Sequence, residues 1–94
     1  MNFEWDPLKD RENQQKHGVS FAEAVGAWID PRRVTRAERR HGSSREQRYF
    51  LLGQVSGAVL TVRFTRRGET VRIIGAGYWR DGRMIYEEAN RFRR

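Results

Sequence analysis

The polar and apolar positions of the first thirty residues predict a short strand followed by two helices. Phe3 and Trp5 alternate with polar neighbours, which is typical of a strand. Asp6-Pro7 predicts a helix start, because aspartate can cap the first free amides and proline suits the first helical position. We expect this helix to cover residues 8–17 and to stop at Gly18, which readily adopts a left-handed conformation.

A second helix is predicted immediately afterwards. Ser20 and Glu23 have the S-x-x-E spacing of a capping box, which marks a helix start. The apolar residues that follow fall at the i, i+3, i+4, i+7 spacing of one helix face: Phe21, Ala24, Val25 and Trp28. Asp30-Pro31 ends this helix, because the residue before a proline is disfavoured in the helical region.

The middle of the chain predicts consecutive strands joined by tight turns. Residues 33–37 are compatible with a short strand, and clearer strands are expected over 47–54, 58–65 and 70–78. Ser56-Gly57 and the segment 66–69 are turn signals. In 58–65 the alternation sends two sets of side chains to opposite faces, Leu60, Val62 and Phe64 against Thr61, Arg63 and Thr65. Short strands joined in this way make an antiparallel sheet.

From about Arg80 the chain is expected to be helical, with Ile85, Ala89 and Phe92 on one face. The predicted fold class is therefore α+β. Two N-terminal helices and a C-terminal helix pack on one side of an antiparallel sheet of three to four strands, in a single domain over residues 1–94. The opposite face of such a sheet can meet water or a ligand.

The charge distribution adds a candidate function to this fold. The chain has a formal net charge of +7, yet residues 1–30 hold only three cations against six anions. Every cation after Pro31 is an arginine, whose planar donors match phosphate geometry. A small domain of this kind is a candidate phosphate-backbone binder, although a basic surface without a specific partner gives the same composition.

Several classes of function are disfavoured by what the chain lacks. It has no cysteine, which excludes disulfides, thiol chemistry and cysteine-based zinc sites. His17 and His41 are the two histidines, and neither has ligand-spaced carboxylates nearby, so no metal site and no cofactor are expected. No signal peptide is recognisable, and no apolar run approaches the roughly 20 residues of a membrane helix. We therefore expect a cytoplasmic protein that does not bind membranes.

The arginines and aromatic residues of the predicted sheet form the candidate site. Arg48, Arg63 and Arg72 interrupt apolar strands, and Arg67 lies in a hairpin turn. Nearby aromatic side chains could stack on bases: Tyr49, Tyr78, Trp79 and Tyr86. These are the means of binding single-stranded RNA. They also suffice for cleavage without a metal, because the ribose 2′-hydroxyl is then the nucleophile and arginines stabilise the phosphate.

An acid and a base would assist this cleavage, and the candidates are Glu46, His41, His17 and Tyr86. Each has a structural alternative. Glu46 can pair with Arg45 or Arg48, His17 suits a helix C-terminus, and Tyr86 can be part of the core. The strand arginines, likewise, can pair with acidic residues across the fold, such as Asp6, Asp10 or Glu87.

Several motifs occur along the chain in a characteristic order. The longest is the run Phe3-x-Trp5-Asp6-x-x-Lys9-x-x-x-Asn13-x-x-Lys16-His17-Gly18-Val19-x-Phe21-x-x-Ala24. It is followed by Asp30-Pro31, Glu46-x-Arg48 with Gly53, Phe64-Thr65-Arg66-Arg67-Gly68, Arg72-Ile73-Ile74 and Arg83-Met84-Ile85-Tyr86-Glu87. Together they resemble the BrnT family of toxins from bacterial type II toxin–antitoxin systems.

The resemblance implies a RelE-like fold and a metal-independent endoribonuclease that blocks translation. It implies a BrnA-like antitoxin as partner, whose ribbon-helix-helix domain would bind the operator DNA for the complex. It places Glu46, Arg48, Arg67 and Arg72 at the active site. With Glu46 as the base, Tyr86 or His41 would donate a proton to the leaving oxygen. We expect further RNA contacts from Arg63, Tyr78, Arg80 and Arg83.

One departure from the family pattern bears on catalysis. The family usually continues R-I-I-S-A-R, whereas this chain has Gly75-Ala76-Gly77 after Arg72-Ile73-Ile74. Arg80 or Arg83 could supply the charge of the missing arginine. The alternative is a non-catalytic module that binds RNA or a protein partner through a degenerate active site.

Overall fold

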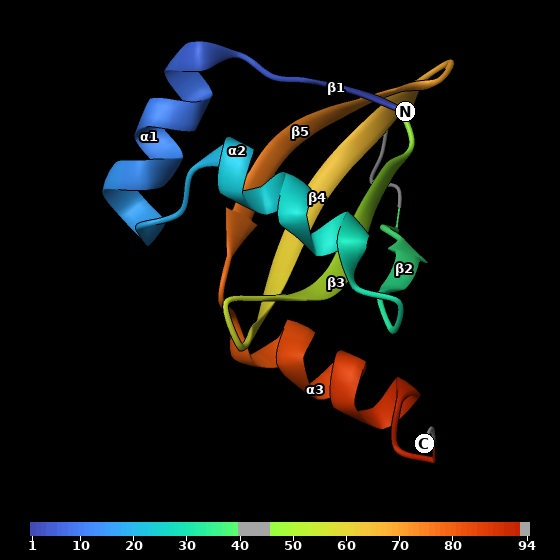
Figure 1. Ribbon diagram of the computed structural model, residues 1–94. Helices are drawn as coiled ribbons and strands as arrows, with labels where there is room; N and C mark the ends of the chain where they lie inside the picture. The colour runs from blue at the N-terminus through green and yellow to red at the C-terminus, as the bar shows by residue number, and fades with distance from the viewer. Residues whose placement is uncertain (40–45, 93–94) are drawn as a thin grey trace.

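The chain forms five strands and three α-helices in the part that the computed structural model describes, residues 1–39 and 46–92. In chain order the elements are β1 (Asn2–Glu4), α1 (Pro7–His17), α2 (Phe21–Ala24), the 3₁₀ turn η1 (Val25–Ile29), β2 (Val34–Ala37), β3 (Arg48–Val55), β4 (Ala58–Arg67), β5 (Thr70–Gly77) and α3 (Arg80–Ala89). The strands make one sheet in the order β1-β5-β4-β3-β2 (Figure 1).

The helix boundaries follow the capping signals of the sequence. The Asp6 side chain accepts a hydrogen bond from the Leu8 amide at 2.9 Å and caps α1. Gly18 ends the helix at φ +69°, a left-handed conformation that costs glycine little. Ser20 caps α2 by accepting from the Glu23 amide at 3.0 Å. The second predicted helix is present as α2 followed by η1, and not as one continuous α-helix.

The sheet differs from the prediction in its edge strands. Three to four antiparallel strands were expected, but β1 joins the sheet as a fifth strand and runs parallel to β5. In this pairing Phe3 lies beside Val71 and Glu4 beside Arg72. The chain between β1 and β5 includes most of the domain, so no local sequence pattern predicts that these two strands pair. The sheet is therefore mixed.

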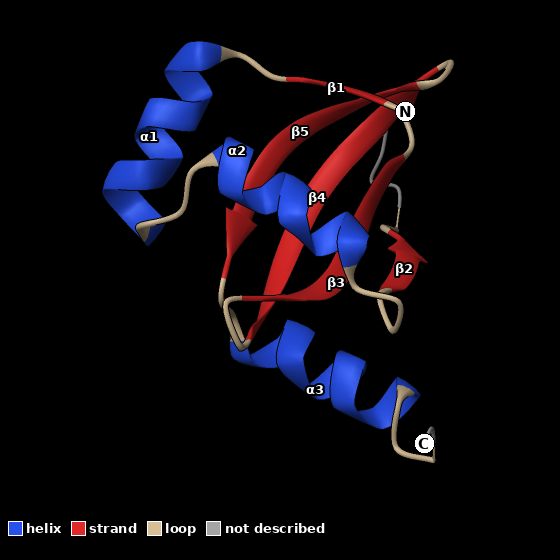
Figure 2. Ribbon diagram, viewed as in Figure 1, coloured by secondary structure: helices blue, strands red, loops and turns tan. Residues whose placement is uncertain are grey.

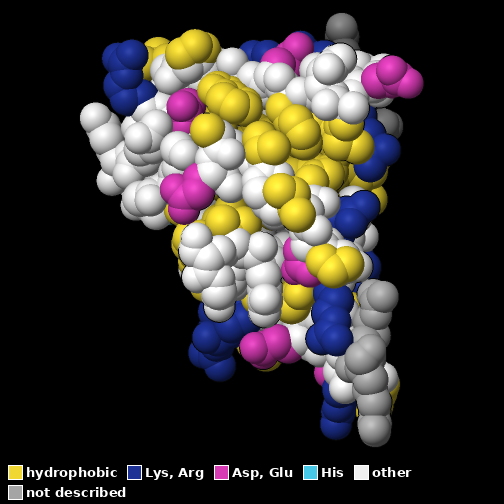
Figure 3. Space-filling model, viewed as in Figure 1, with side chains coloured by type: hydrophobic (Ala, Val, Ile, Leu, Met, Phe, Trp, Pro, Cys, Tyr) yellow, Lys and Arg dark blue, Asp and Glu magenta, His cyan; other side chains and the backbone are white. Residues whose placement is uncertain are grey.

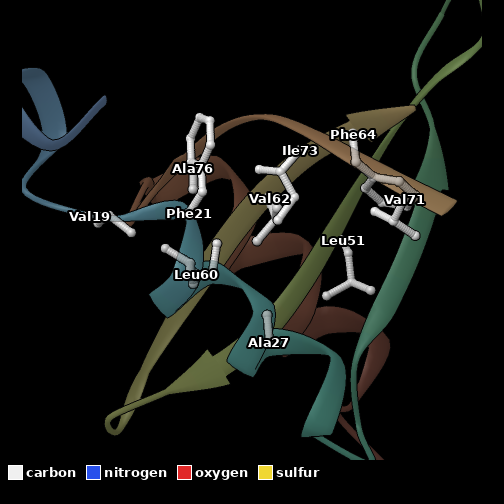
Figure 4. Close-up of a cluster of buried hydrophobic side chains, with 11 residues drawn as sticks. Val19, Phe21, Ala27, Leu51, Leu60, Val62, Phe64, Val71, Ile73 and Ala76 are labelled. Carbon is white, nitrogen blue, oxygen red and sulfur yellow. The ribbon is translucent and has the colours of Figure 1, made fainter. Parts of the chain in front are cut away.

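The main hydrophobic core lies between the sheet and α2–η1. Leu60, Val62 and Phe64 of β4 point into it, as the alternation predicted, and pack with Phe21 and Ala27 (Figure 4). We call this side of the sheet the α2 face. Figure 2 shows α2 and η1 crossing in front of the long central strands.

The C-terminal helix packs on the other side of the sheet, which corrects the prediction of helices on one side only. Tyr86 of α3 belongs to a second cluster with Leu52 and Val59, which point away from the α2 face. We call this side the α3 face. The α3 helix packs on this side because Leu52 and Val59 are apolar, and burying them requires a second layer on this face of the sheet. Among the described helices, none is long and apolar enough to cross a membrane.

Candidate functional site

A row of polar residues crosses the sheet on the α3 face. Arg48 on β3 lies opposite Thr65 on β4, Thr65 lies opposite Arg72 on β5, and Arg72 lies beside Glu4 on β1. Because neighbouring strands are about 4.8 Å apart, the backbones of Arg48 and Arg72 are roughly 10 Å apart with Thr65 between them. The two arginines therefore stand on either side of a threonine in a fixed arrangement.

An irregularity in β5 lies next to this row. Phe64 pairs with Ile73 whereas Arg63 pairs with Gly75, so Ile74 is an extra residue without an opposite partner on β4. Bulges of this kind bend a strand and redirect its side chains, and they are frequent beside active sites.

The row forms one wall of a pocket of about 190 Å³, which we call the arginine pocket. It is lined by residues of β3, β4, β5, the N-terminal part of α1 and the segment before β3: Asp6, Lys9, Glu46, Arg48, Thr65, Arg67, Arg72, Ile73 and Ile74. Four residues that the sequence proposed as catalytic thus meet here, namely Glu46, Arg48, Arg67 and Arg72.

Carboxylates hold two of these arginines. Arg72 Nη1 donates to Glu4 Oε2 at 2.7 Å, and Arg67 Nη1 is 3.8 Å from the same oxygen. Arg67 Nε donates to Glu46 Oε2 at 3.1 Å. This hydrogen bond and the charge of Glu46 raise the pKa of Arg67 above its ordinary value. Pairing was the structural alternative that the sequence indicated, but Arg72 and Arg67 pair with Glu4 and Glu46 and not with Asp6, Asp10 or Glu87. Arg45, which was also named as a partner of Glu46, lies outside the described residues.

Thr65 and Lys9 are pocket residues to which sequence reasoning gave no role. Thr65 is only 2% exposed, and its hydroxyl has no hydrogen-bond partner among the described residues. A buried hydroxyl without a partner is costly unless a ligand satisfies it. The alternation of β4, which places Thr65 on the face of Arg63, could have indicated Thr65. The Asp6-x-x-Lys9 spacing of the N-terminal motif could have indicated Lys9.

Tyr86 does not line the arginine pocket. It is 6% exposed, and its hydroxyl donates to Asp30 Oδ2 at 2.6 Å. Asp30 also accepts from the amides of Gln54 and Arg32, both at 2.8 Å. Burial alone raises the pKa of Asp30, but the hydrogen bonds from Tyr86 and the two amides outweigh it, so the pKa lies below its ordinary value. Tyr86 therefore connects α3 to the end of η1.

The expected RNA contacts are distributed over different surfaces. Arg63 is on the α3 face, where its Nη2 forms an ion pair with Glu38 Oε1 at 2.9 Å. Tyr78 turns toward α2 and donates to Glu23 Oε2 at 3.5 Å. Burial, and next the charge of Glu23, raise the pKa of Tyr78. Arg80 and Arg83 are exposed on α3 and are not among the described residues that line the arginine pocket.

His17 is not among the described residues that line the arginine pocket. His41 lies outside the described residues. His17 is at the end of α1, where its ring meets the Trp79 ring edge-to-face with centroids 5.1 Å apart. Among residues 1–39 and 46–92, no group of three or more histidine, aspartate and glutamate side chains could hold a metal ion.

The packing of Trp79 explains why position 77 is a glycine. A Cβ atom on Gly77 would lie 2.5 Å from two carbon atoms of the Trp79 ring, so the indole occupies the space that a larger side chain would need. Gly75, by contrast, has no atom of the described residues within 4 Å of such a position. The arginine expected from the family pattern is thus replaced by a glycine on which a tryptophan packs.

A family model described as the ribonuclease toxin BrnT of a type II toxin–antitoxin system matches residues 5–82, which include all of α1 to β5 and the first residues of α3. No curated protein matches the chain.

Proposed function

The chain belongs to the BrnT family of ribonuclease toxins of type II toxin–antitoxin systems, and we propose that its arginine pocket binds and cleaves single-stranded RNA. The observation that carries this proposal is the composition of the pocket. Arg48, Arg67 and Arg72 line it together with Thr65, whose buried hydroxyl has no partner among the described residues. Cations and a hydroxyl group that line one space suit a phosphate, because arginine and hydroxyl groups both donate to its oxygens.

In the proposed reaction the RNA itself supplies the nucleophile. Glu46 accepts the proton of a ribose 2′-hydroxyl, and the 2′-oxygen forms a bond to the adjacent phosphorus. The bond from phosphorus to the 5′-oxygen of the next nucleotide breaks, that oxygen takes up a proton from solvent water, and Glu46 returns its proton to the solvent. The products are a 2′,3′-cyclic phosphate and a 5′-hydroxyl. No oxidant, reductant or metal enters this balance.

The arginines act on the charge that develops at the phosphorus. Donors that are already oriented stabilise this charge without reorganising during the step. The ion pairs with Glu4 and Glu46 support this role, because they hold Arg72 and Arg67 toward the pocket. Glu46 is itself paired with Arg67, and its carboxylate can accept a proton when the substrate displaces the pair.

The biological partners follow from the family. A type II toxin is neutralised by a protein antitoxin, and we propose a BrnA-like antitoxin with a ribbon-helix-helix domain. In this arrangement RNA cleavage inhibits translation, the antitoxin blocks the toxin, and operator DNA is contacted only through the antitoxin.

The test is cleavage of a short unstructured RNA by the purified chain. We expect cleavage in the presence of a metal chelator, a product that ends in a 2′,3′-cyclic phosphate, and no cleavage of the same RNA with 2′-O-methyl groups throughout. Arg72→Ala should reduce the rate by about 100-fold or more, in line with the loss of one charge-stabilising donor.

Arg66→Ala is the matched control, because Arg66 adjoins Arg67 in the sequence but lies 5.6 Å from the centroid of the Tyr49 ring, on the α2 face. It should keep the wild-type rate. Equal loss in both variants would contradict the assignment of the pocket. Binding of RNA with no cleavage at all would favour the non-catalytic alternative, which the glycines at positions 75 and 77 support.

A further inference from the structure

A second pocket adjoins the arginine pocket on the α3 face. It has a volume of about 340 Å³, which is within the range of pockets that hold small ligands. Lys9 and Ile74 line both pockets, so the two lie next to each other beside α1 and β5, and we call them together the groove. The far end of the second pocket is formed by Trp79, His17 and Gly75.

Trp79 is a fixed aromatic surface at this end of the groove. Its ring packs on the backbone at Gly77 and meets the His17 ring edge-to-face. It is half-buried, and it precedes the first turn of α3 as the N-cap residue. An indole that is held on two sides and still lines a pocket loses little conformational entropy when a ligand stacks on it.

We propose that Trp79 is a stacking platform for a nucleobase of the RNA strand whose phosphate lies in the arginine pocket. This inference rests on the proposed function. Base stacking on an aromatic ring is tolerant of sequence, since every base has a π-face. The subsite therefore takes any unpaired nucleotide, and it selects single-stranded RNA over a duplex in which the bases are stacked on each other.

The spacing along the sheet suits neighbouring nucleotides of one strand. Gly77, on which the Trp79 ring packs, lies opposite Thr61 on β4. Thr61 is four residues from Thr65, which corresponds to about 13 Å along a strand. Arg63 lies between these positions and lines the second pocket, where it can meet an intervening phosphate.

The charges of the second pocket favour a nucleic-acid backbone. Among the described lining residues, the cations are Lys9, Lys16 and Arg63, and the one carboxylate is that of Glu12. Arg63 is held by Glu38, as Arg72 is held by Glu4. The groove therefore combines cationic side chains with one aromatic surface, as proteins that bind single-stranded nucleic acid commonly do.

The test uses a pentanucleotide RNA with 2′-O-methyl groups throughout, which cannot be cleaved, and a set in which each base in turn is removed. Binding is measured by fluorescence anisotropy at one salt concentration. For the wild-type chain, removal of one particular base should weaken binding about tenfold, the effect of losing one stacked base. Trp79→Ala should weaken binding of the intact RNA by a similar factor.

The decisive measurement combines the Trp79→Ala variant with the RNA that lacks the critical base. If the base stacks on Trp79, Trp79→Ala should cause no further loss with that abasic RNA, and Trp79→Phe should keep most of the affinity of the intact RNA. Phe92→Ala is the matched control, because Phe92 is an 86% exposed aromatic residue after α3 and should not matter. Thermal unfolding of each variant shows that it is folded.

This design distinguishes failure of the stacking proposal from failure of the proposed function. Independent, additive losses from the variant and the missing base would overturn the stacking proposal while RNA binding and cleavage remain. If Trp79→Ala fails to fold, the Trp79→Phe variant decides, since the proposal requires near wild-type affinity from it. A chain that binds none of these RNAs and cleaves no unmodified RNA would instead contradict the proposed function.

Discussion

Glutamates orient the arginines of the α3 face before any RNA binds. Glu4 contacts both Arg72 and Arg67, and Glu46 contacts Arg67. The side chains in these pairs are between 30% and 55% exposed, so the pairs add little to the stability of the fold. Their effect is positional, because each pair limits the rotamers of a long side chain and leaves its remaining N–H groups for a ligand.

Thr65→Val should separate function from stability at a single position. Valine keeps the shape but removes a hydroxyl that has no partner among the described residues, so stability should stay the same or rise. If this hydroxyl donates to the phosphate, kcat/KM for RNA cleavage should fall by about 10- to 100-fold, the range for a hydrogen bond to a charged group. Single-turnover cleavage and urea unfolding measure the two effects.

Thr65→Ser should restore cleavage, since it returns the hydroxyl. Thr61→Val is a matched control, because the Thr61 hydroxyl also lacks a partner among the described residues but lies beside Gly82 of α3. An unchanged cleavage rate in Thr65→Val would remove Thr65 from the phosphate site.

At the scale of elements, the sequence predicts helix ends and strand faces, which depend on neighbouring residues. The caps at Asp6 and Ser20 and the stop at Gly18 are in the structure where the motifs indicated. The alternation of β4 placed Leu60 in the core and Arg63 on the opposite face. Each of these features depends on residues within about four positions of one another, so a single sequence reveals it.

Features that depend on distant residues could not be predicted in the same way. The parallel pairing of β1 with β5 is set by the whole fold, and so is the contact of Glu4 with Arg72. Tyr86 illustrates the limit for the site. Its motif suggested catalysis, whereas its position is decided by how α3 packs on Leu52. The placement of the Trp79 ring likewise involves a distant residue, His17 of α1, whose ring it meets edge-to-face.

Tyr86→Phe tests the connection between α3 and η1. The variant loses a hydrogen bond to the ionised Asp30, which should lower the free energy of unfolding by about 1–2 kcal/mol at pH 7. The pKa of Asp30 is lowered in the folded state, so its contribution is present above the unfolded value of about 4 and is lost as the pH falls through the folded value. The deficit of the variant should therefore shrink in acid.

Urea unfolding at pH 7 and near pH 3 measures this change. Tyr78→Phe is the control, because the Tyr78 hydroxyl makes only long hydrogen bonds of 3.4 and 3.5 Å and should affect stability little. Loss of RNA cleavage in a stable Tyr86→Phe variant would instead support the catalytic role that the sequence suggested for Tyr86.

At the scale of the molecule, the two faces of the sheet have different characters. Figure 3 looks onto α2 and shows hydrophobic side chains gathered over α2 and β1, with Lys and Arg mainly at the margins and over α3. Ile29, at the end of η1, is 80% exposed. The arginine pocket lies on the opposite, α3 face. The net charge of +7 attracts RNA without specificity, whereas the arginine pocket provides a specific binding site.

This separation predicts how RNA affinity depends on salt. For single strands, log K falls with log[salt] by about 0.7 for each phosphate that is neutralised. Removing Arg48, Arg67 and Arg72 together should therefore reduce the slope by about 2. The affinity of the uncleavable pentanucleotide between 50 and 300 mM salt, roughly the range in which this effect is measurable, gives the slope.

Arg91→Ala should leave the slope unchanged, because Arg91 lies beyond the end of α3 and pairs with Glu88. If the triple variant keeps the wild-type slope, the attraction arises from the general basic surface and the pocket has no special part in binding.

The pairing of β1 with β5 also determines when the arginine pocket can form during synthesis of the chain. Glu4 and Arg72 are 68 residues apart in the chain. At a synthesis rate of about 5–20 residues per second, roughly 3–14 s pass between the addition of the first and the second. Until then the arginine pocket lacks one of its walls. A ribosome therefore has to reach Arg72 before the arginine pocket can assemble, and a shorter nascent chain lacks the site that we propose for RNA cleavage.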